Sequence, residues 1–176
     1  QVGRFSYGDY QLDDLVFDGR LDKGLLRIQK LAGKAWGGSL DASGSVQAGD
    51  NRVALKAVAS GVNVNALLNT VAKYDNLEGT GRVTADLRTH GASVQAMKSQ
   101  LAGTAALQLR DGAVKGLNLA RALRQARAAL TLKQDAVEQA RATEKTDFSE
   151  LSASFVIDQG VARNQDLDAK SPFLRL

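Results

Sequence analysis

LAGTAALQLRDGAVKGLNL, residues 101–119, and TDFSELSASFVIDQG, residues 146–160, decide the fold of this chain. In both stretches apolar side chains occupy every second position, which is the period of a β-strand with one apolar face. Asp111-Gly112 in the first stretch is typical of a turn, and Asp158-Gln159-Gly160 closes the second. They predict two strands of a sheet with unlike faces, and a chain reversal at Asp111-Gly112. The side chains expected on the apolar face are Leu107, Leu109, Leu151, Phe155 and Ile157.

The composition indicates a folded chain with one core. Its 176 residues are 44% hydrophobic, too many for a disordered chain, but only 5% aromatic. The net charge of +4 is modest, permits contact with anionic membranes and does not require nucleic acid, which we do not expect as a partner. The absence of cysteine excludes disulfides and thiol chemistry. The sequence contains no run of about 18 apolar residues, so it predicts no membrane-spanning helix.

Further strands precede the two diagnostic stretches. Residues 52–60 alternate cleanly after a turn at Gly49-Asp-Asn51, and residues 10–18 form a strand whose register breaks at Asp13-Asp14, as in a β-bulge. The strands follow one another as hairpins and not as β-α-β units. This order favours a mainly antiparallel sheet with helices on one face or at one end.

Two or three helices are expected among the strands. Residues 65–73 and 93–100 are short candidates, each starting at a residue suited to a helix N-cap. The main helix is predicted to start near Asn118, where Leu119, Leu123 and Leu130 form one apolar stripe that would pack on the sheet. The fold class predicted is therefore mainly β (α+β): a curved antiparallel sheet or groove with two or three helices.

No combination of residues in the sequence is typical of a catalytic or metal site. His90 is the only histidine and stands at the end of a predicted strand, so we interpret it as a surface or turn residue. The acidic residues between Asp9 and Asp22 lack the spacing of a calcium-binding loop. We therefore expect a protein without catalytic residues, metal or cofactor. Trp36 is either a membrane-interface anchor or a core residue, and the sequence does not decide between the two.

Five sequence blocks follow one another in a recognisable order. They are GVNVNALL from residue 61, LEGTGRVTADLRTHG from 77, LAGTAALQLRDGAVKGLNLARALR from 101, KTDFSELSASFVIDQGVARNQDL from 145 and SPFLRL from 171. In this order they resemble the C-terminal region of the AsmA family of bacterial envelope proteins. The resemblance covers residues 61–176, whereas residues 1–60 are similar only in style, as extended strands. We expect residues 1–176 to be one domain and a fragment of a longer protein, because the chain opens on Gln1 and stops within an apparent strand.

The resemblance implies a location and a function. Proteins of this kind are anchored in the inner membrane by one N-terminal helix and extend into the periplasm. They belong to a group thought to form long β-sheet grooves that carry phospholipid acyl chains between membranes and support outer-membrane biogenesis. We therefore expect the apolar face predicted above to contact acyl chains where no helix covers it.

An alternative function remains open from the sequence. In this alternative, the chain is an envelope scaffold that binds another protein by strand addition or through its amphipathic helix. We also expect the fragment to form edge-to-edge dimers, because an exposed strand edge pairs with whatever is available.

Overall fold

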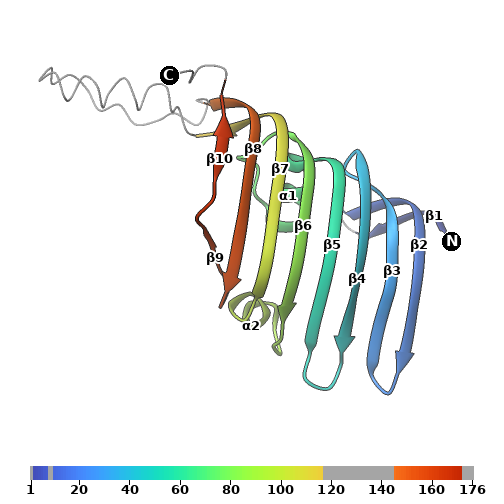
Figure 1. Cartoon of the computed structure of the whole chain (residues 1–176). Coiled ribbons are helices and arrows are strands. Elements are labelled where there is room, and N and C mark those ends of the chain that lie inside the picture. Colours follow the sequence, from blue (N-terminus) through green and yellow to red (C-terminus); the bar gives the residue numbers. More distant parts are fainter. Residues whose placement is uncertain (1, 8–9, 117–144, 172–176) are drawn as a thin grey trace, which may run out of the picture.

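The computed structural model describes residues 2–7, 10–116 and 145–171, and these form one ten-stranded antiparallel sheet (Figure 1). Strands β1 to β8 lie side by side in chain order, and β8 pairs with both β9 and β10. The predicted mainly β, antiparallel architecture built from hairpins is confirmed. The strands are β1 (Val2–Tyr7), β2 (Tyr10–Asp22), β3 (Leu25–Ala35), β4 (Gly38–Gln47), β5 (Arg52–Asn63), β6 (Thr80–Thr89), β7 (Ala102–Lys115), β8 (Lys145–Asp158), β9 (Val161–Asn164) and β10 (Asp168–Lys170).

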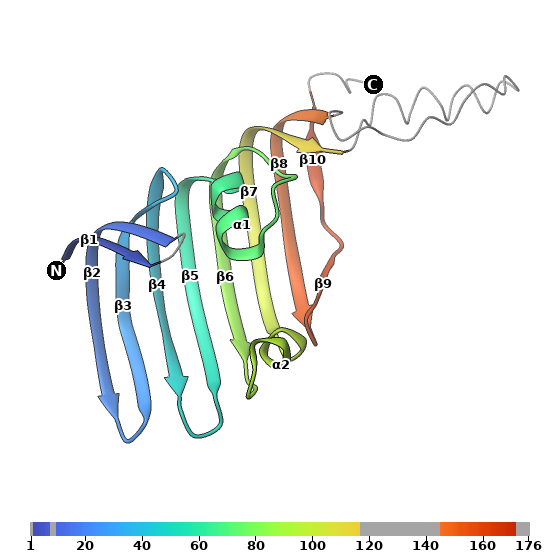
Figure 2. The ribbon, with the colours of Figure 1, turned by 180° about the vertical axis from the view of Figure 1, so that it is seen from behind.

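Two short helices accompany the sheet in the described part of the chain. Helix α1 (Val64–Ala72) lies against one face near one end of the strands, and α2 (Val94–Ser99) lies at the opposite end (Figure 2). Both were predicted, although α1 is capped by Asn63, two residues before the expected start. The predicted main helix near Asn118, with Leu119, Leu123 and Leu130, lies outside the described residues.

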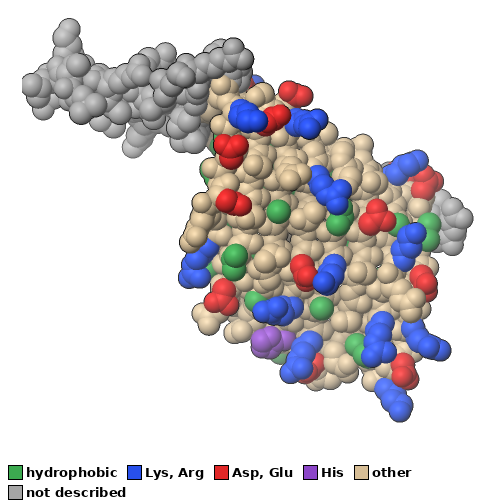
Figure 3. Space-filling view, viewed as in Figure 1, with side chains coloured by type: hydrophobic (Ala, Val, Ile, Leu, Met, Phe, Trp, Pro, Cys, Tyr) green, Lys and Arg blue, Asp and Glu red, His purple; other side chains and the backbone are tan. Residues whose placement is uncertain are grey.

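The alternation of side chains gives the sheet two unlike faces. On the α1 side, paired positions carry apolar residues, as where Leu40, Ala59 and Val83 lie in line across β4, β5 and β6. On the other side the next positions carry polar residues, and the Lys56 ammonium lies 2.9 Å from the Asp86 carboxylate. Figure 3 shows this second face, with Lys, Arg, Asp and Glu side chains scattered over it.

Local irregularities bend two of the strands. Asp14 adopts a left-handed conformation with φ 54° where the β2–β3 register shifts, so the predicted bulge is confirmed. Asp111 also has a positive φ, of 50°, but β7 continues past it and Gly112 pairs with Phe148 of β8. The predicted chain reversal at Asp111-Gly112 is therefore wrong. An Asp tolerates the left-handed conformation, so the strand is kinked there without being turned back.

The core lies between α1 and the sheet. Val64 of α1 packs with Leu109, Phe148 and Leu151 from β7 and β8, and all four are buried. A second cluster joins Leu67 of α1 to Ala59 and Val62 of β5. Trp36 packs against this second cluster, and its indole N–H donates to the Thr70 hydroxyl of α1 at 3.2 Å. The indole therefore serves as a packing residue that connects the β3–β4 turn to the helix.

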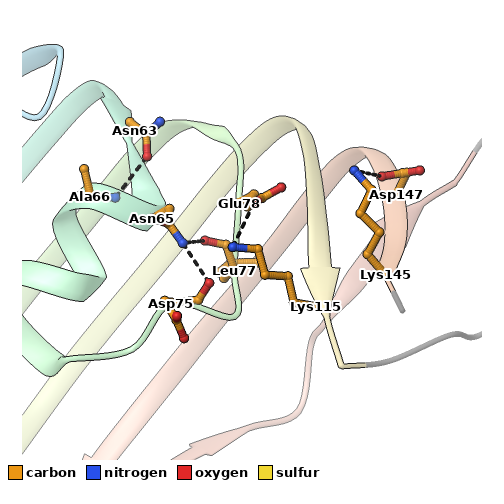
Figure 4. Close-up of polar contacts among 9 residues, drawn as sticks. All are labelled: Asn63, Asn65, Ala66, Asp75, Leu77, Glu78, Lys115, Lys145 and Asp147. Atoms are coloured by element: carbon orange, nitrogen blue, oxygen red, sulfur yellow. Dashed lines mark hydrogen bonds and ion pairs between the residues drawn. The ribbon is translucent and has the colours of Figure 1, made fainter. Parts of the chain in front are cut away.

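Polar contacts hold α1 at its end of the sheet (Figure 4). The Asn63 side chain accepts a hydrogen bond from the Ala66 N–H at 3.0 Å and caps the first turn. The Asn65 amide donates to the carbonyl oxygens of Asp75 and Leu77, in the segment that returns the chain to β6. Beside this segment the Lys115 ammonium lies 2.9 Å from the Glu78 carboxylate and lowers the pKa of Glu78. These contacts fix the helix over one end of the apolar face only.

Candidate functional site

Two rows of apolar residues cross the sheet at right angles to the strands. The first, here called the alanine row, places one residue of each strand from β3 to β8 in register: Leu31, Ala42, Ala57, Ala85, Ala105 and Phe155. The second, called the leucine row, lies next to it and farther from α1: Ile28, Gly44, Leu55, Leu87, Gly103 and Ile157. Every residue of both rows is apolar or glycine. Together the two rows are called the open apolar face.

Helix α1 is too narrow to cover this face. The distance from β3 to β8 is about 24 Å at the usual strand spacing, whereas a helix with its side chains is about 10–12 Å wide. The two rows accordingly stay partly accessible: Phe155 and Ile157 are half-buried, and Leu55 is 39% exposed. The structure thus leaves a strip of apolar side chains in contact with solvent along the sheet, and such a strip is uncommon unless it binds something.

The five residues predicted for the apolar face all lie on it, but in different surroundings. Leu109 and Leu151 are buried beneath α1, at 2% and 7% exposure. Leu107 is partly buried and packs against the same cluster. Phe155 and Ile157 belong to the open apolar face. The register of β7 and β8 brings all five together, whereas α1 separates those that pack inside from those that remain accessible.

The prediction missed the greater part of the open apolar face, which lies on β3 to β6. Leu55 and Ala57 stand in the alternating stretch of residues 52–60, and Leu87 alternates with Asp86 and Arg88. This alternation was a usable signal for each strand taken singly. What it lacked was the pairing register, which decides whether the apolar positions of neighbouring strands lie on the same face.

Charged pairs of the described strands lie outside the two apolar rows, for example Lys56 with Asp86 on the other face. The Lys170 ammonium lies 2.6 Å from the Glu150 carboxylate, which raises the pKa of Lys170 and lowers that of Glu150. Lys34 contacts Asp14 at 2.7 Å, and this partner raises the pKa of Lys34. All of these groups are exposed, so solvent screens the pairs and they stabilise the fold little. The sheet therefore has a charged face opposite an apolar one.

The described residues offer no group of three or more His, Cys, Asp or Glu side chains placed to hold a metal ion. His90 is exposed and follows the last residue of β6. Among the described helices, none has the length and apolar character needed to cross a bilayer. The chemistry that the arrangement supports is the non-directional contact of apolar side chains with apolar matter.

Comparison with known proteins gives a family. A model of the AsmA family matches residues 1–167. The match includes residues 1–60, so the expectation that the likeness is specific only from residue 61 onward was too narrow. No curated protein and no solved structure matches the chain.

Proposed function

The chain belongs to the AsmA family, and on that premise we propose that its open apolar face shields the acyl chains of phospholipids as they pass between membranes. The protein is then a non-catalytic periplasmic module of a chain anchored in the inner membrane, and it contributes to outer-membrane biogenesis. The observation that carries the proposal is the continuity of the two apolar rows from β3 to β8, on the part of the sheet that α1 leaves accessible.

The sizes of the side chains on the open apolar face suit an acyl chain. The alanine row lies between two rows in which larger side chains are interspersed with Ala or Gly. The larger ones are Leu40, Val83 and Leu107 on the α1 side and Ile28, Leu55, Leu87 and Ile157 on the other. A chain lying along the alanine row therefore has methyl groups beneath it from β4 to β7 and branched side chains at intervals on either side. The groove that this arrangement forms, together with curvature of the sheet around it, is part of the proposal.

The energies of these contacts favour movement of an acyl chain along the face over tight binding at one place. Each methylene removed from water contributes about 0.8 kcal/mol, so even partial cover of an acyl chain is favourable. Contacts of this kind have no preferred direction, and one row position resembles the next. An acyl chain can thus move along the row with little change in free energy, which is what a conduit requires.

The alternative is an envelope scaffold that binds another protein. Such a scaffold also needs an accessible surface, and a sheet edge or an apolar face could provide it. The two functions differ in what the open apolar face contacts in the cell, and this difference can be measured directly.

Ala105 and Ala106 provide a matched pair for the test. They are adjacent residues of the same type and are both half-buried, but Ala105 lies in the alanine row and Ala106 pairs with Ser154 on the polar face. A photo-crosslinking side chain is placed at each position in the full-length protein, cells carrying labelled phosphate are irradiated, and the purified protein is examined for bound phospholipid. We expect capture at Ala105 and at Leu87, and none at Ala106.

Two results would decide against acyl-chain binding. Equal capture at Ala105 and Ala106 would mean that the label reports the surrounding membrane and not the face. Crosslinks from Ala105 and Leu87 to protein alone, with no phospholipid, would replace the proposal with the scaffold function.

A further inference from the structure

The polar face of the sheet contains a depression near the strand ends farthest from α1. The depression is open to solvent, has a volume of about 690 Å³ and extends from β4 to β8, on the face that Figure 3 shows. Small side chains line it, and the strand pairing places two of them, Ser45 and Ala54, in one row with Arg88 and Ala102. Because these small residues leave space above the sheet, the depression can hold a ligand.

Two opposite charges border this depression without meeting one another. Arg88 of β6 and Asp158 of β8 both line it, and both are exposed. Arg88 pairs with Ala102 of β7, and Asp158 follows Ile157, which pairs with Gly103. The two charged residues are thus at one level of the sheet with Ala102 between them, about 10 Å apart at the usual strand spacing. Within residues 10–116 and 145–171 neither side chain forms a hydrogen bond or an ion pair.

The neighbours of Arg88 explain why it has no partner in the described sheet. The residues opposite it on β5 and β7 are both alanine, Ala54 and Ala102. Asp86, the next acidic residue on the same face of β6, binds the Lys56 ammonium at 2.9 Å. The local pairing therefore leaves the guanidinium available to a molecule from outside.

We propose that the depression binds a zwitterion that carries a phosphate and a primary ammonium, the chemistry of phosphoethanolamine. The Arg88 guanidinium binds the phosphate, because its planar fork of N–H donors matches two phosphate oxygens. The Asp158 carboxylate accepts hydrogen bonds from the ammonium. A lone anion would leave Asp158 without a partner, and a lone cation would leave Arg88 without one, whereas the zwitterion satisfies both.

The other polar side chains of the depression favour phosphate over carboxylate. Gln47, His90 and Gln100 line it and carry N–H donors, and Ser45 carries a hydroxyl. A carboxylate has two oxygens, which one guanidinium satisfies. A phosphate has further oxygens, and these donors are placed around the same depression to bind them.

The size of the depression leaves the source of the zwitterion to experiment. A volume of about 690 Å³ is typical of sites for drug-sized ligands, so there is room for the group to which the phosphate is esterified. A free phosphoethanolamine and a lipid headgroup present the same two charges. Since the depression and the open apolar face lie on opposite faces of the sheet, this inference does not depend on what the open apolar face binds.

Titration of the protein with phosphoethanolamine, followed by amide chemical shifts in nuclear magnetic resonance spectra, tests the site. We expect the shifts to concentrate at residues 45–47, 88–90, 100–102 and 157–159. Phosphoethanolamine should bind about fivefold more tightly than inorganic phosphate or ethanolamine, which each engage only one of the two exposed charges. Phosphocholine should also bind more weakly, because its trimethylammonium group has no N–H to donate.

Substitutions separate the two halves of the site. Arg88→Gln should weaken the binding of phosphoethanolamine and of inorganic phosphate alike. Asp158→Asn should leave inorganic phosphate unaffected and remove the preference for phosphoethanolamine over it. Arg110→Gln is the matched control, since Arg110 is an exposed arginine on the same face of β7, farther from this end of the strands. It should bind as the unaltered protein does, and because all three side chains are exposed, the three melting temperatures should be unchanged.

Vesicles distinguish the two sources. Co-sedimentation is measured with phosphatidylcholine vesicles that contain or lack phosphatidylethanolamine. Extra binding to phosphatidylethanolamine that Arg88→Gln abolishes identifies a lipid headgroup as the ligand, whereas binding of soluble phosphoethanolamine alone identifies a free compound, and either result supports the site. Three results overturn it: no shifts in the depression at millimolar phosphoethanolamine, equally tight binding of inorganic phosphate or glycine, or binding that survives both Arg88→Gln and Asp158→Asn.

Discussion

Leu109 of β7 lies opposite Leu151 of β8, and both side chains are buried beneath α1. Farther along the same two strands, Ala105 lies opposite Phe155 on the same face but on the open side of the helix. One pair of strands thus contributes to the core at one end and to the open apolar face at the other. Packing and ligand contact are separated along the strand and do not compete for the same residue.

Truncation of Leu109 tests the packing half of this arrangement. Leu109→Ala leaves a cavity between α1 and the sheet, and we expect a loss of about 2–5 kcal/mol in the free energy of unfolding. Leu55→Ala is the control, because Leu55 lies on the same face but is 39% exposed. Its loss should be much smaller. Urea denaturation monitored by circular dichroism measures both, and equal losses would contradict the position of α1.

Removal of the helix cap tests how α1 is held. Asn63→Ala deletes the side chain that accepts from the Ala66 N–H, so the stability should fall by about 1 kcal/mol. Asn69→Ala, at an exposed position in the same helix, should not lower it. Thermal melts of the two variants make the comparison. A greater loss at Asn69 would place the helix start elsewhere.

Asp166 connects the β9–β10 segment to β8 and gives it a pH dependence. Its carboxylate accepts hydrogen bonds from the Ser154 hydroxyl, the Ser154 N–H and the Asn164 amide, and these bonds lower the pKa of Asp166 from its ordinary 3.8. Because the folded-state pKa is the lower one, the stabilisation is complete above pH 3.8 and disappears as the pH falls through the folded-state value. Asp166→Asn should therefore lower the melting temperature at neutral pH.

The difference between Asp166→Asn and the unaltered chain should shrink in acid. Melting temperatures measured from neutral pH to below pH 3.8 should converge for these two proteins, provided both still fold there. Asp168→Asn, two residues farther along, is the control and should follow the unaltered chain throughout. A difference that stays constant with pH would show that the carboxylate charge is not what holds the segment.

Glycine at position 81 allows β6 and β7 to approach each other. A β-carbon at Gly81 would overlap the Gln108 carbonyl oxygen and lie 2.9 Å from the Leu109 α-carbon. Since backbone atoms cannot swing aside, Gly81→Ala should destabilise the fold by about 1–3 kcal/mol. Gly49→Ala is the control, because nothing lies within 4 Å of its β-carbon position. If chemical denaturation finds both substitutions harmless, the β6–β7 contact is looser than described.

The sequence predicted the strands better than their ends. Alternation identified β5, β7 and β8 because each is long and has one apolar face. It failed at Asp111-Gly112 because Asp-Gly is a pair typical of turns, as is Gln159-Gly160, where the chain does reverse. In the structure both Gln159 and Gly160 have a positive φ, whereas in the other pair only Asp111 does. The difference lies in the neighbours: residues 112–115 still have a partner in β8, and Ala113 exchanges backbone hydrogen bonds with Glu78. No local pattern carries that information.

The apolar character of the site could be predicted from the sequence, but the set of strands that contribute to it could not. Phe155 and Ile157 could be placed on an apolar face from their own strand, but whether Leu55 and Leu87 share it depends on register across three more strand pairs. The stripe of Leu119, Leu123 and Leu130 was the stronger sequence signal, whereas the helix that packs on the described sheet is the short one after Asn63. Its cap and two buried residues, Val64 and Leu67, are too few for periodicity to rank it first.

The strand order has a consequence for how such a sheet can grow. From β1 to β7 each described strand pairs only with strands that are its neighbours in the chain. Stability in an arrangement of this kind is approximately a sum of nearest-neighbour terms, as in repeat proteins. Duplicating or deleting one whole hairpin would keep every other pairing and keep each face on its own side, because two strands restore the original direction. The length of the apolar surface is therefore adjustable in hairpin steps, without redesign of the remaining fold.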